Sequence, residues 1–428
     1  MDGSYLPQVR AQYEALPYPP RDPEEESQRL LPTWLDSLPM INHYCFAGQQ
    51  DFRHGWRVLA AGGGTGDATI YLAEQLRATD AEIVHLDLSA ASIAIARRRA
   101  EIRGLENIRW QQASLLELPG LGLGEFDYIN CSGVLHHLPD PDAGLRALLG
   151  VLAADGAIGM MVYATYGRTG VYQMQELLRR INGGCEGIGQ CLDNARQVLA
   201  TLPATNWFAR GEQLISDHRR GDAGIYDLLL HSQDRSYTVE ELYVWLHDAH
   251  GLHIEFSDVG RGRAPYLPEL VLAPRQPPFL DTVARLPPRQ QQAIAELLGG
   301  TLVTHSFYLC RGARVAPYGD PEYVPFFCHE PVTGPELSAI IHRSKEVPFV
   351  MRHSHTGISA PLDVGRFGKF ILKYIDGRRS FAEVFALVRG EEKFRRSPPD
   401  DATLFADFAP LYRFLNAIER MLLTRCRA

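Results

Sequence analysis

The feature that most constrains the fold is a glycine-rich turn between an apolar segment and a helical one. RVLAA predicts a short buried strand, GGGTGD follows it, and ATIYLAEQLRA predicts a helix. Gly62, Gly64 and Gly66 carry no side chain, so the backbone can approach a ligand closely at the N-terminus of this helix. A strand, a glycine turn and a helix in this order predict an α/β sheet with a ligand at the carboxyl ends of its strands.

The segments that follow continue the alternation of strand and helix. EIVHLD, NIRWQQA, FDYINC and GAIGMMVY predict four further strands, and SAASIAIARRRAEIRG predicts a helix with Ser89 as its N-cap. GLRALLGVLA predicts the helix before GAIGMMVY, while LHIEFSDV and THSFYLCR predict the sixth and seventh strands. This order predicts a doubly wound, mainly parallel α/β sheet of seven strands.

Composition divides the chain of 428 residues into three parts, because this length exceeds one ordinary domain. Residues 1–55 are rich in proline and aromatic residues and predict an arm or lid. Residues 56–316 predict the α/β core, in which residues 164–250 form a mainly helical insertion that serves as a substrate cap. Residues 317–428 predict a small helical or winged-helix domain.

Charge and hydropathy exclude several classes of protein. The net charge is -8 and no long run of lysine or arginine occurs, so no nucleic-acid partner is expected. No apolar run approaches the roughly 20 residues of a membrane span, and the N-terminus lacks the profile of a signal peptide. A cytoplasmic protein without membrane contact is therefore expected. Among the seven cysteines, Cys185 and Cys191 form the only close pair; free thiols are expected, a disulfide or a zinc site is the alternative, and no metal is predicted.

Asp87 is the candidate residue for binding a nucleoside. It ends the second predicted strand, 21 residues after Gly66. An acid at this position can accept hydrogen bonds from both hydroxyls of a ribose. Because the carboxyl ends of parallel strands meet at one edge of the sheet, Asp87 and the glycine turn are expected to lie side by side.

Four segments in this order resemble motifs of the class I S-adenosylmethionine-dependent methyltransferases. VLAAGGGTGDATIYLAEQL resembles motif I, VHLDLS the acidic motif, and NIRWQQASLLEL the segment that flanks adenine. FDYINCSGVLHHLPDP, with LLGVLAADGAIGMMVY after it, resembles motif IV and the next helix–strand unit. The resemblance covers residues 56–163 and, more loosely, 252–311. It implies a Rossmann-like fold, S-adenosylmethionine as cofactor and S-adenosylhomocysteine as product.

The resemblance also implies the residues that contact the cofactor. The glycine turn would cradle the methionine part, Asp87 would bind the ribose, and the segment after the fourth strand would form a floor beneath the sulfonium. The implied residues are Gly62, Gly63, Gly64, Thr65, Gly66, Asp87, Leu88, Ser114, Leu115, Cys131, Ser132 and Gly133. Two positions depart from the family pattern: Ala60 stands where an acid is usual, and Ser114 where many members carry aspartate.

Tyr18 and Arg21 in the N-terminal arm are further candidates for contact with the cofactor. A lid over the cofactor would place Arg21 near its carboxylate. The alternative is that this Tyr–Pro segment only attaches the arm to the surface.

Candidate catalytic residues follow the fourth and fifth strands. The cofactor supplies a reactive electrophile, so the protein must mainly orient the acceptor, and a base is helpful rather than indispensable. The candidates are His136, His137, Tyr163 and Tyr166. The alternatives are that His137 packs structurally and that the tyrosines attach the insertion to the core.

The C-terminal segment provides the best indication of the acceptor. FGKFILKYIDGRRSFAEVFALV predicts a helix–turn–helix, with Ser380 and Glu383 as a capping box, and resembles small winged-helix modules, some of which recognise peptides. It favours a protein or peptide side chain as acceptor. A small molecule or natural product is the second hypothesis, and a non-catalytic regulatory protein that binds the cofactor is the third, because Ala60 replaces an acid. A unit that mediates a homodimer is the structural alternative.

Overall fold

The computed structural model describes residues 7–185, 187–329, 332–346, 348–353 and 357–425. The chain divides into two compact units, each made of three segments. Unit 1 comprises Met1–Asp36, Phe52–Ile254 and Gly300–Arg311, and unit 2 comprises Ser37–Asp51, Glu255–Gly299 and Gly312–Ala428. The predicted arm of residues 1–55 is thus shared between the units, and part of the predicted core belongs to unit 2.

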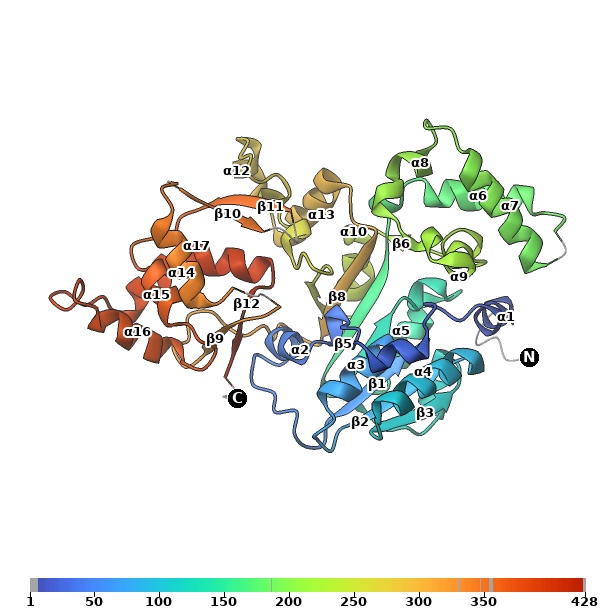
Figure 1. Cartoon of the computed structure of the whole chain (residues 1–428), viewed down its shortest axis with the longest axis horizontal. Coiled ribbons are helices and arrows are strands. Elements are labelled where there is room, and N and C mark those ends of the chain that lie inside the picture. The colour runs from blue at the N-terminus through green and yellow to red at the C-terminus, as the bar shows by residue number, and fades with distance from the viewer. Residues whose placement is uncertain (1–6, 186, 330–331, 347, 354–356, 426–428) are drawn as a thin grey trace. The chain divides into compact units, whose positions relative to one another are not determined.

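Unit 1 is built on a central sheet with the strand order β3-β2-β1-β4-β5-β8-β7 (Figure 1). The first five strands of this order run parallel, and β8 is antiparallel to β5. A short strand, β6, pairs with the end of β5. This arrangement confirms the predicted seven-stranded Rossmann-like sheet. The strands are β1 Arg57–Ala61, β2 Glu82–Asp87, β3 Ile108–Gln112, β4 Phe126–Ser132, β5 Leu152–Ala164, β6 Ser236–Tyr237, β7 His253–Phe256 and β8 Thr304–Cys310.

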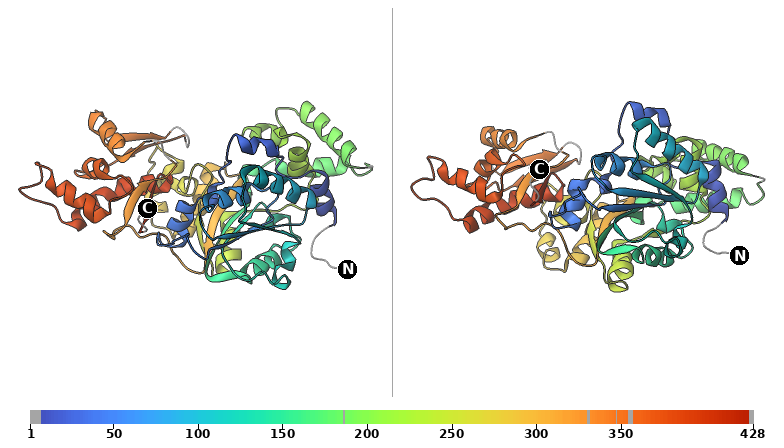
Figure 2. Two further views of the ribbon diagram at one scale, coloured as in Figure 1. Left: turned by 60° about the horizontal axis from the view of Figure 1, so that its bottom comes forward. Right: turned by 90° about the horizontal axis from the view of Figure 1, so that it is seen from below.

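Helices cover both faces of this sheet (Figure 2). The strand order reverses between β1 and β4, so right-handed crossovers on either side of that point fall on opposite faces. The crossover helices are α3 Asp67–Gln75, α4 Ala90–Arg103 and α5 Pro141–Leu149. Ser89 caps α4 as predicted, because its Oγ accepts a hydrogen bond from the N–H of Ser92 at 3.1 Å.

One predicted helix boundary is wrong. GLRALLGVLA was expected to be helical throughout, but α5 ends at Leu149 and β5 begins at Leu152. The carbonyl of Val151 accepts a hydrogen bond from the N–H of Phe126 at 2.8 Å, at the start of β4. Pairing with the sheet therefore overrides the helical propensity of the last residues of this segment.

The N-terminal arm is attached to α3 and α4 by a buried group of charges. The arm contains α1 Pro7–Ala15 and a 3₁₀ turn, Pro23–Ser27. Arg99 of α4 donates to Glu26 of this turn at 2.6 Å and to Asp67 at 2.7 Å, and the side chains of Arg99 and Glu26 are 1% and 3% exposed. Arg103 also pairs with Glu26. Buried charges require such partners, so this group determines where the arm lies.

The insertion after β5 is mainly helical, as predicted. It contains α6 Val171–Ile181, α7 Ile188–Thr201, α8 Trp207–Gly211 and α9 Gly221–Ile225, which lie together in Figure 1. Their apolar faces form a separate core that includes Leu178, Leu192 and Phe208. Cys185 and Cys191 are free thiols in the structure. After β6, α10 Val239–Leu242 continues as a π-helix, Tyr243–Asp248, and leads to β7.

Unit 2 combines helices with two small antiparallel sheets. β9 Val324–Phe327 pairs with β12 Met421–Thr424, and β10 Phe349–His353 pairs with β11 Ile358–Leu362. Its helices are α2 Leu38–Cys45, α11 Pro268–Val271, α12 Phe279–Val283, α13 Pro288–Gly299, α14 Gly334–Arg343, α15 Gly368–Tyr374, α16 Phe381–Gly390 and α17 Asp401–Ala417. The predicted helix–turn–helix corresponds to α15 and α16, and Ser380 with Glu383 forms the predicted capping box. The winged-helix description stays a prediction.

His43 explains why residues 37–51 belong to unit 2. Its ring is fully buried, and its Nδ1 accepts a hydrogen bond from the N–H of Leu423 in β12 at 3.0 Å. The side-chain amide of Asn416 lies 3.1 Å from its Nε2. These contacts join α2 to the C-terminal strand of the same unit.

None of the helices in the described ranges has the length and apolarity needed to cross a bilayer.

Replacing Glu26 tests the attachment of the arm. Glu26→Ala leaves the guanidinium of Arg99 buried with Asp67 as its remaining acid, and we expect a loss of about 3 kcal/mol in the free energy of unfolding. Urea denaturation followed by circular dichroism measures this loss. Glu24→Ala is the matched control, because Glu24 pairs with Arg98 in solvent. Equal stability of the two variants would contradict the proposed role of the buried pair.

Candidate functional site

The glycine turn connects β1 to α3 beside the point where the strand order reverses. The N–H groups of Gly62 and Gly63 donate to the carbonyl of Leu86, at 2.8 and 3.0 Å, so the turn is bonded to the end of β2. Gly62, Gly64 and Gly66 have φ angles of 70°, 54° and 99°. Residues with side chains rarely adopt these angles, so the conformation of the turn requires glycine.

Asp87 lies at the end of β2 and its carboxylate joins two elements. One oxygen accepts from the N–H of Gly64 at 2.8 Å and the other from the N–H of Ser89 at 2.8 Å. Burial raises the pKa of Asp87, and these backbone hydrogen bonds oppose the shift. Each carboxylate oxygen can accept a further hydrogen bond, so the group retains capacity for the hydroxyls of a ribose.

Leu88, Ser114 and Leu115 follow the ends of the neighbouring strands β2 and β3. Asp87 is in register with Gln112, which places these loops side by side. Ser114 is buried and caps the turn after β3, where its N–H donates to Glu117 at 2.7 Å. Leu115 is buried and Leu88 is half-buried.

Cys131, Ser132 and Gly133 form the end of β4 and the start of its loop. The N–H of Gly133 donates to the carbonyl of Met161 at 3.0 Å, which aligns this segment with β5. Burial raises the pKa of the Cys131 thiol, so it remains protonated.

Asp36 is a residue at this edge of the sheet that sequence reasoning missed. It is buried and accepts from the side-chain amide of Asn130 in β4 at 2.8 Å. Burial raises its pKa to about 6, and hydrogen bonds from Asn130 and Tyr128 oppose this shift. Acids with perturbed pKa values cluster at functional sites. No motif surrounds Asp36 in the sequence. The sequence pointed to this position only through its partner, Asn130.

The residues at this edge fit S-adenosylmethionine. A Cβ on Gly62 would lie 2.5 Å from a methyl carbon of Val134, and one on Gly63 would lie 2.5 Å from the ring of His85. The turn therefore has no room for side chains at these positions. Its glycine N–H groups are bonded within the protein. Carbonyl oxygens and the Asp87 carboxylate therefore remain as acceptors, which suits a cofactor that brings an ammonium group and ribose hydroxyls as donors.

The candidate catalytic residues His136, His137 and Tyr163 lie together. The ring centroids of His136 and Tyr163 are 3.8 Å apart, and those of His136 and His137 are 4.2 Å apart. Neither ring nitrogen of His136 has a hydrogen-bond partner among the described residues. Burial lowers the pKa of His136 well below its usual value and that of His137 to about 4, so both rings are neutral near pH 7. Tyr166 is half-buried in the turn directly after β5.

Asp227 and His231 complete this group, although no motif in the sequence marks them. Asp227 is 3% exposed and accepts from the hydroxyls of Tyr13 at 3.1 Å and of Tyr163 at 3.2 Å. Burial raises the pKa of its carboxyl group. The ring of His231 stacks on that of His137 at 3.9 Å. We call Tyr13, His136, His137, Tyr163, Asp227 and His231 the polar cluster.

Three members of the polar cluster have the side chains of a metal site, but their orientation does not suit one. Ligand atoms of His137, Asp227 and His231 all lie within 4.8 Å of one another. The two rings are stacked at an interplanar angle of 28°, so their lone pairs do not converge on one point. In addition, Nδ1 of His231 accepts from the N–H of Gln233, which requires the proton on Nε2. The cluster is a hydrogen-bonded group of proton donors and acceptors.

A buried ion pair fixes the ring of Tyr163. The guanidinium of Arg168 lies 3.6 Å from the centre of this ring, and Arg168 pairs with Asp234 at 3.5 Å. Gln175 of α6 also donates to Asp234, at 2.8 Å. The insertion therefore supplies both the acid of the polar cluster and the support for Tyr163.

The arm residues Tyr18 and Arg21 lie near the glycine turn but have protein partners. A Cβ on Gly64 would lie 2.8 Å from the carbonyl oxygen of Tyr18, and the hydroxyl of Tyr18 donates to Asp217 at 3.1 Å. Arg21 pairs with Asp67 at 2.5 Å. The arm thus covers the turn through its backbone, and the guanidinium of Arg21 is engaged by an acid of α3.

Comparisons with known proteins agree with this geometry. Residues 59–158 match the family model described as a methyltransferase domain. An uncharacterized protein of Synechococcus sp. is 34% identical over 318 residues, which is 73% of each chain. Demethylmenaquinone methyltransferase of Thermus thermophilus is 37% identical over 107 residues, but the match spans only 47% of that enzyme. PKMT2 from Rickettsia typhi, solved in complex with AdoHcy, has a TM-score of 0.60 at 15% identity, over 92% of this chain and 76% of that one.

The Rossmann-like fold and the methyltransferase-domain match define a protein that binds S-adenosylmethionine. The chain belongs to the class I S-adenosylmethionine-dependent methyltransferases and is an enzyme of that class. The predicted family, cofactor and enzyme class are confirmed. The individual contacts assigned to the cofactor stay predictions.

Replacing Asp87 tests the ribose contact. Asp87→Ala removes two hydrogen bonds to a charged group, each about 1.5 kcal/mol or more, so we expect affinity for S-adenosylhomocysteine to fall by at least about 100-fold. Isothermal titration calorimetry measures this affinity, and thermal unfolding checks that the variant is folded. Asp80→Ala is the control, because Asp80 is an exposed acid before the start of β2. Unchanged affinity in the folded Asp87 variant would exclude the contact.

Proposed function

We propose that this methyltransferase modifies a side chain of a peptide or protein. The observation that carries the proposal is unit 2, a second compact unit with its own hydrophobic core. Methyl transfer needs only a cofactor site and an acceptor site, and the candidate residues for both lie in unit 1. A second unit of this size is best explained by recognition of an acceptor that extends beyond the reacting group.

The polar cluster of unit 1 has the chemistry to hold and deprotonate an acceptor. When bound, S-adenosylmethionine supplies an electrophilic methyl group. Asp227, whose pKa is raised by burial, can accept the proton that a hydroxyl or amine loses. The neutral ring of His136, with both nitrogens unsatisfied, can bind the polar acceptor group. Burial of the cluster excludes water from this position.

A small-molecule acceptor is the second candidate. His136, His137, Tyr163, Asp227 and His231 are all buried, and an enclosed polar cluster of this kind suits a small aromatic or hydroxylated compound. Demethylmenaquinone methyltransferase, which matches a quarter of this chain, bears the name of such an acceptor. A flexible side chain of a peptide can also enter a narrow site, so enclosure alone does not favour the small molecule.

Labelling a cell lysate separates the two acceptor classes. We expect the full-length protein to transfer label to macromolecules when it is incubated with methyl-labelled S-adenosylmethionine and lysate. Protease digestion should then release this label. Label confined to small molecules would overturn the peptide proposal. Deleting residues 317–428 is not a clean test, because Ser37–Asp51 and Glu255–Gly299 also belong to unit 2 and would lose their partners.

Asp227→Asn tests the proton acceptor. We expect label incorporation to fall by about 10²–10⁴-fold, the usual contribution of a positioned base, with affinity for S-adenosylhomocysteine unchanged. The wild-type rate should decrease as the pH falls through the pKa of Asp227, which burial raises above 3.8, and this acid limb should be absent in the variant. Asp222→Asn is the matched control, since Asp222 is exposed in the same segment. Equal rates and pH profiles for both variants would exclude Asp227 as the base.

A further inference from the structure

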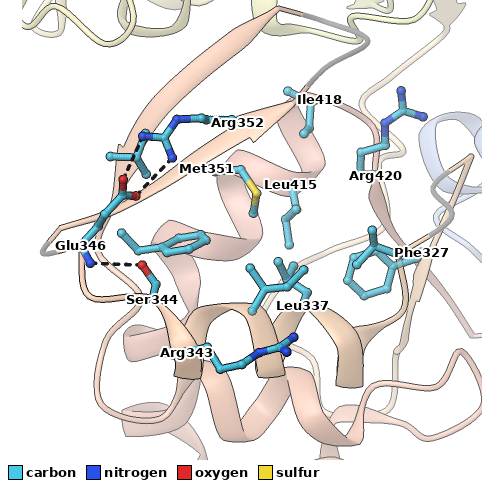
Figure 3. Close-up of a pocket in the computed structure, with 14 residues that line it drawn as sticks. Phe327, Leu337, Arg343, Ser344, Glu346, Met351, Arg352, Leu415, Ile418 and Arg420 are labelled. Carbon is cyan, nitrogen blue, oxygen red and sulfur yellow. Dashed lines mark hydrogen bonds and ion pairs between the residues drawn. The ribbon is translucent and has the colours of Figure 1, made fainter.

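Unit 2 contains a pocket of about 670 Å³ whose residues come from separate elements of the unit (Figure 3). Leu337 and Arg343 project from α14, Met351 and Arg352 from β10, and Leu415 from α17. Pockets of about 300–1,000 Å³ are typical of sites that bind ligands. None of these residues belongs to the polar cluster or to the glycine turn, so the pocket is a separate feature of the molecule.

The pocket has an apolar base and a partly exposed apolar rim. Leu337, Leu415 and Ile418 are 5%, 3% and 1% exposed and form its buried wall. Ile340, on the next turn of α14, is 44% exposed. A large aliphatic side chain left in solvent beside an apolar cavity gains free energy when a second apolar group covers it. The pocket therefore suits a bulky apolar side chain.

The charged residues of the pocket favour an anionic ligand. Three arginines and a single glutamate line it, which leaves an excess of two positive charges in a chain whose net charge is -8. The guanidinium of Arg343 is exposed and donates only to the backbone carbonyl of Ala339, at 3.2 Å, among the described residues. Arg343 therefore lacks an acidic partner within the described chain.

Glu346 shows how an acid binds at this rim. The guanidinium of Arg352 donates to both of its carboxylate oxygens, at 2.9 and 3.2 Å. Both side chains are exposed, at 64% for Arg352 and 44% for Glu346, so the pair is readily exchanged for another partner. An incoming carboxylate would find the same two donors if it displaced Glu346.

The strand that forms one wall of the pocket favours a peptide over a lipid. Four consecutive residues, 349–352, line the pocket, although alternate side chains of a strand point to opposite faces. The pocket thus runs along the edge of β10, and within the described residues β10 pairs with β11 alone. A free strand edge offers backbone donors and acceptors to an extended peptide, whereas a hydrocarbon chain uses neither.

We propose that this pocket binds a segment of the acceptor peptide in which a bulky apolar residue adjoins an aspartate or glutamate. The apolar side chain enters between α14 and β10, and the acid contacts Arg352 and Arg343. This inference rests on the proposed peptide acceptor, and it assigns to unit 2 the recognition of a sequence apart from the methylated side chain.

Fluorescence anisotropy on the full-length protein tests the proposal without methyl transfer. The probe is a fluorescein-labelled octapeptide with a central leucine and phenylalanine flanked by aspartates, and the comparison peptide carries lysines instead. Ile340→Glu should weaken binding of the acidic probe by at least about tenfold, and Arg352→Gln by about fivefold. Glu346→Gln removes the competing carboxylate and should tighten binding by about fivefold. Arg396→Gln, an exposed arginine outside the pocket, is the matched control and should change nothing.

The outcomes distinguish this inference from the proposed function. Binding of the acidic probe with the opposite effects of the Arg352 and Glu346 variants supports the pocket, even where lysate labelling finds no protein acceptor. Equal binding of both peptides, or equal effects of all four variants, would overturn the inference while leaving a protein acceptor possible through labelling. Binding of laurate in isothermal titration calorimetry, without any binding of the peptide, would also overturn it and assign the pocket to a free anionic amphiphile.

Discussion

The buried guanidinium of Arg99 is the interaction on which the arrangement of unit 1 depends. It joins Glu26 of the arm, the carbonyl of Thr65 in the glycine turn and Asp67 at the start of α3. A charge removed from water is tolerated only with close partners, so these segments must meet at one point. The arm held there then covers the glycine turn, and its Tyr13 reaches the acid of the polar cluster.

The polar cluster shows how burial changes the protonation of ordinary side chains. Removing water keeps its histidines neutral and makes the carboxylate of Asp227 more basic. Hydrogen bonds from Tyr13 and Tyr163 then hold that carboxylate in place. The group combines residues of the arm, the loop after β4, the end of β5 and the insertion, so the insertion contributes to the polar cluster.

Much of unit 1 was predictable because its signals are local. The glycine turn, the acid at the end of β2 and the Ser89 cap each depend on residues close in sequence, and the structure contains all three. In unit 2 the capping box of Ser380 follows the same rule. The helix expected over GLRALLGVLA failed at its C-terminal end, because pairing of Val151 with the start of β4 is a contact across the sheet.

The sequence by itself determined the class of the protein, since strand–turn–helix periodicity and an acid at the end of the second strand are features of short stretches of chain. Only the tertiary structure decided which residues form the polar cluster. Asp227 and His231 lie some 90 residues beyond His137, in a helical segment without a motif, and become its neighbours through folding. The same holds for the two units. Residues 37–51 join the C-terminal unit because buried His43 bonds to β12, and no local pattern records a partner that distant in the chain.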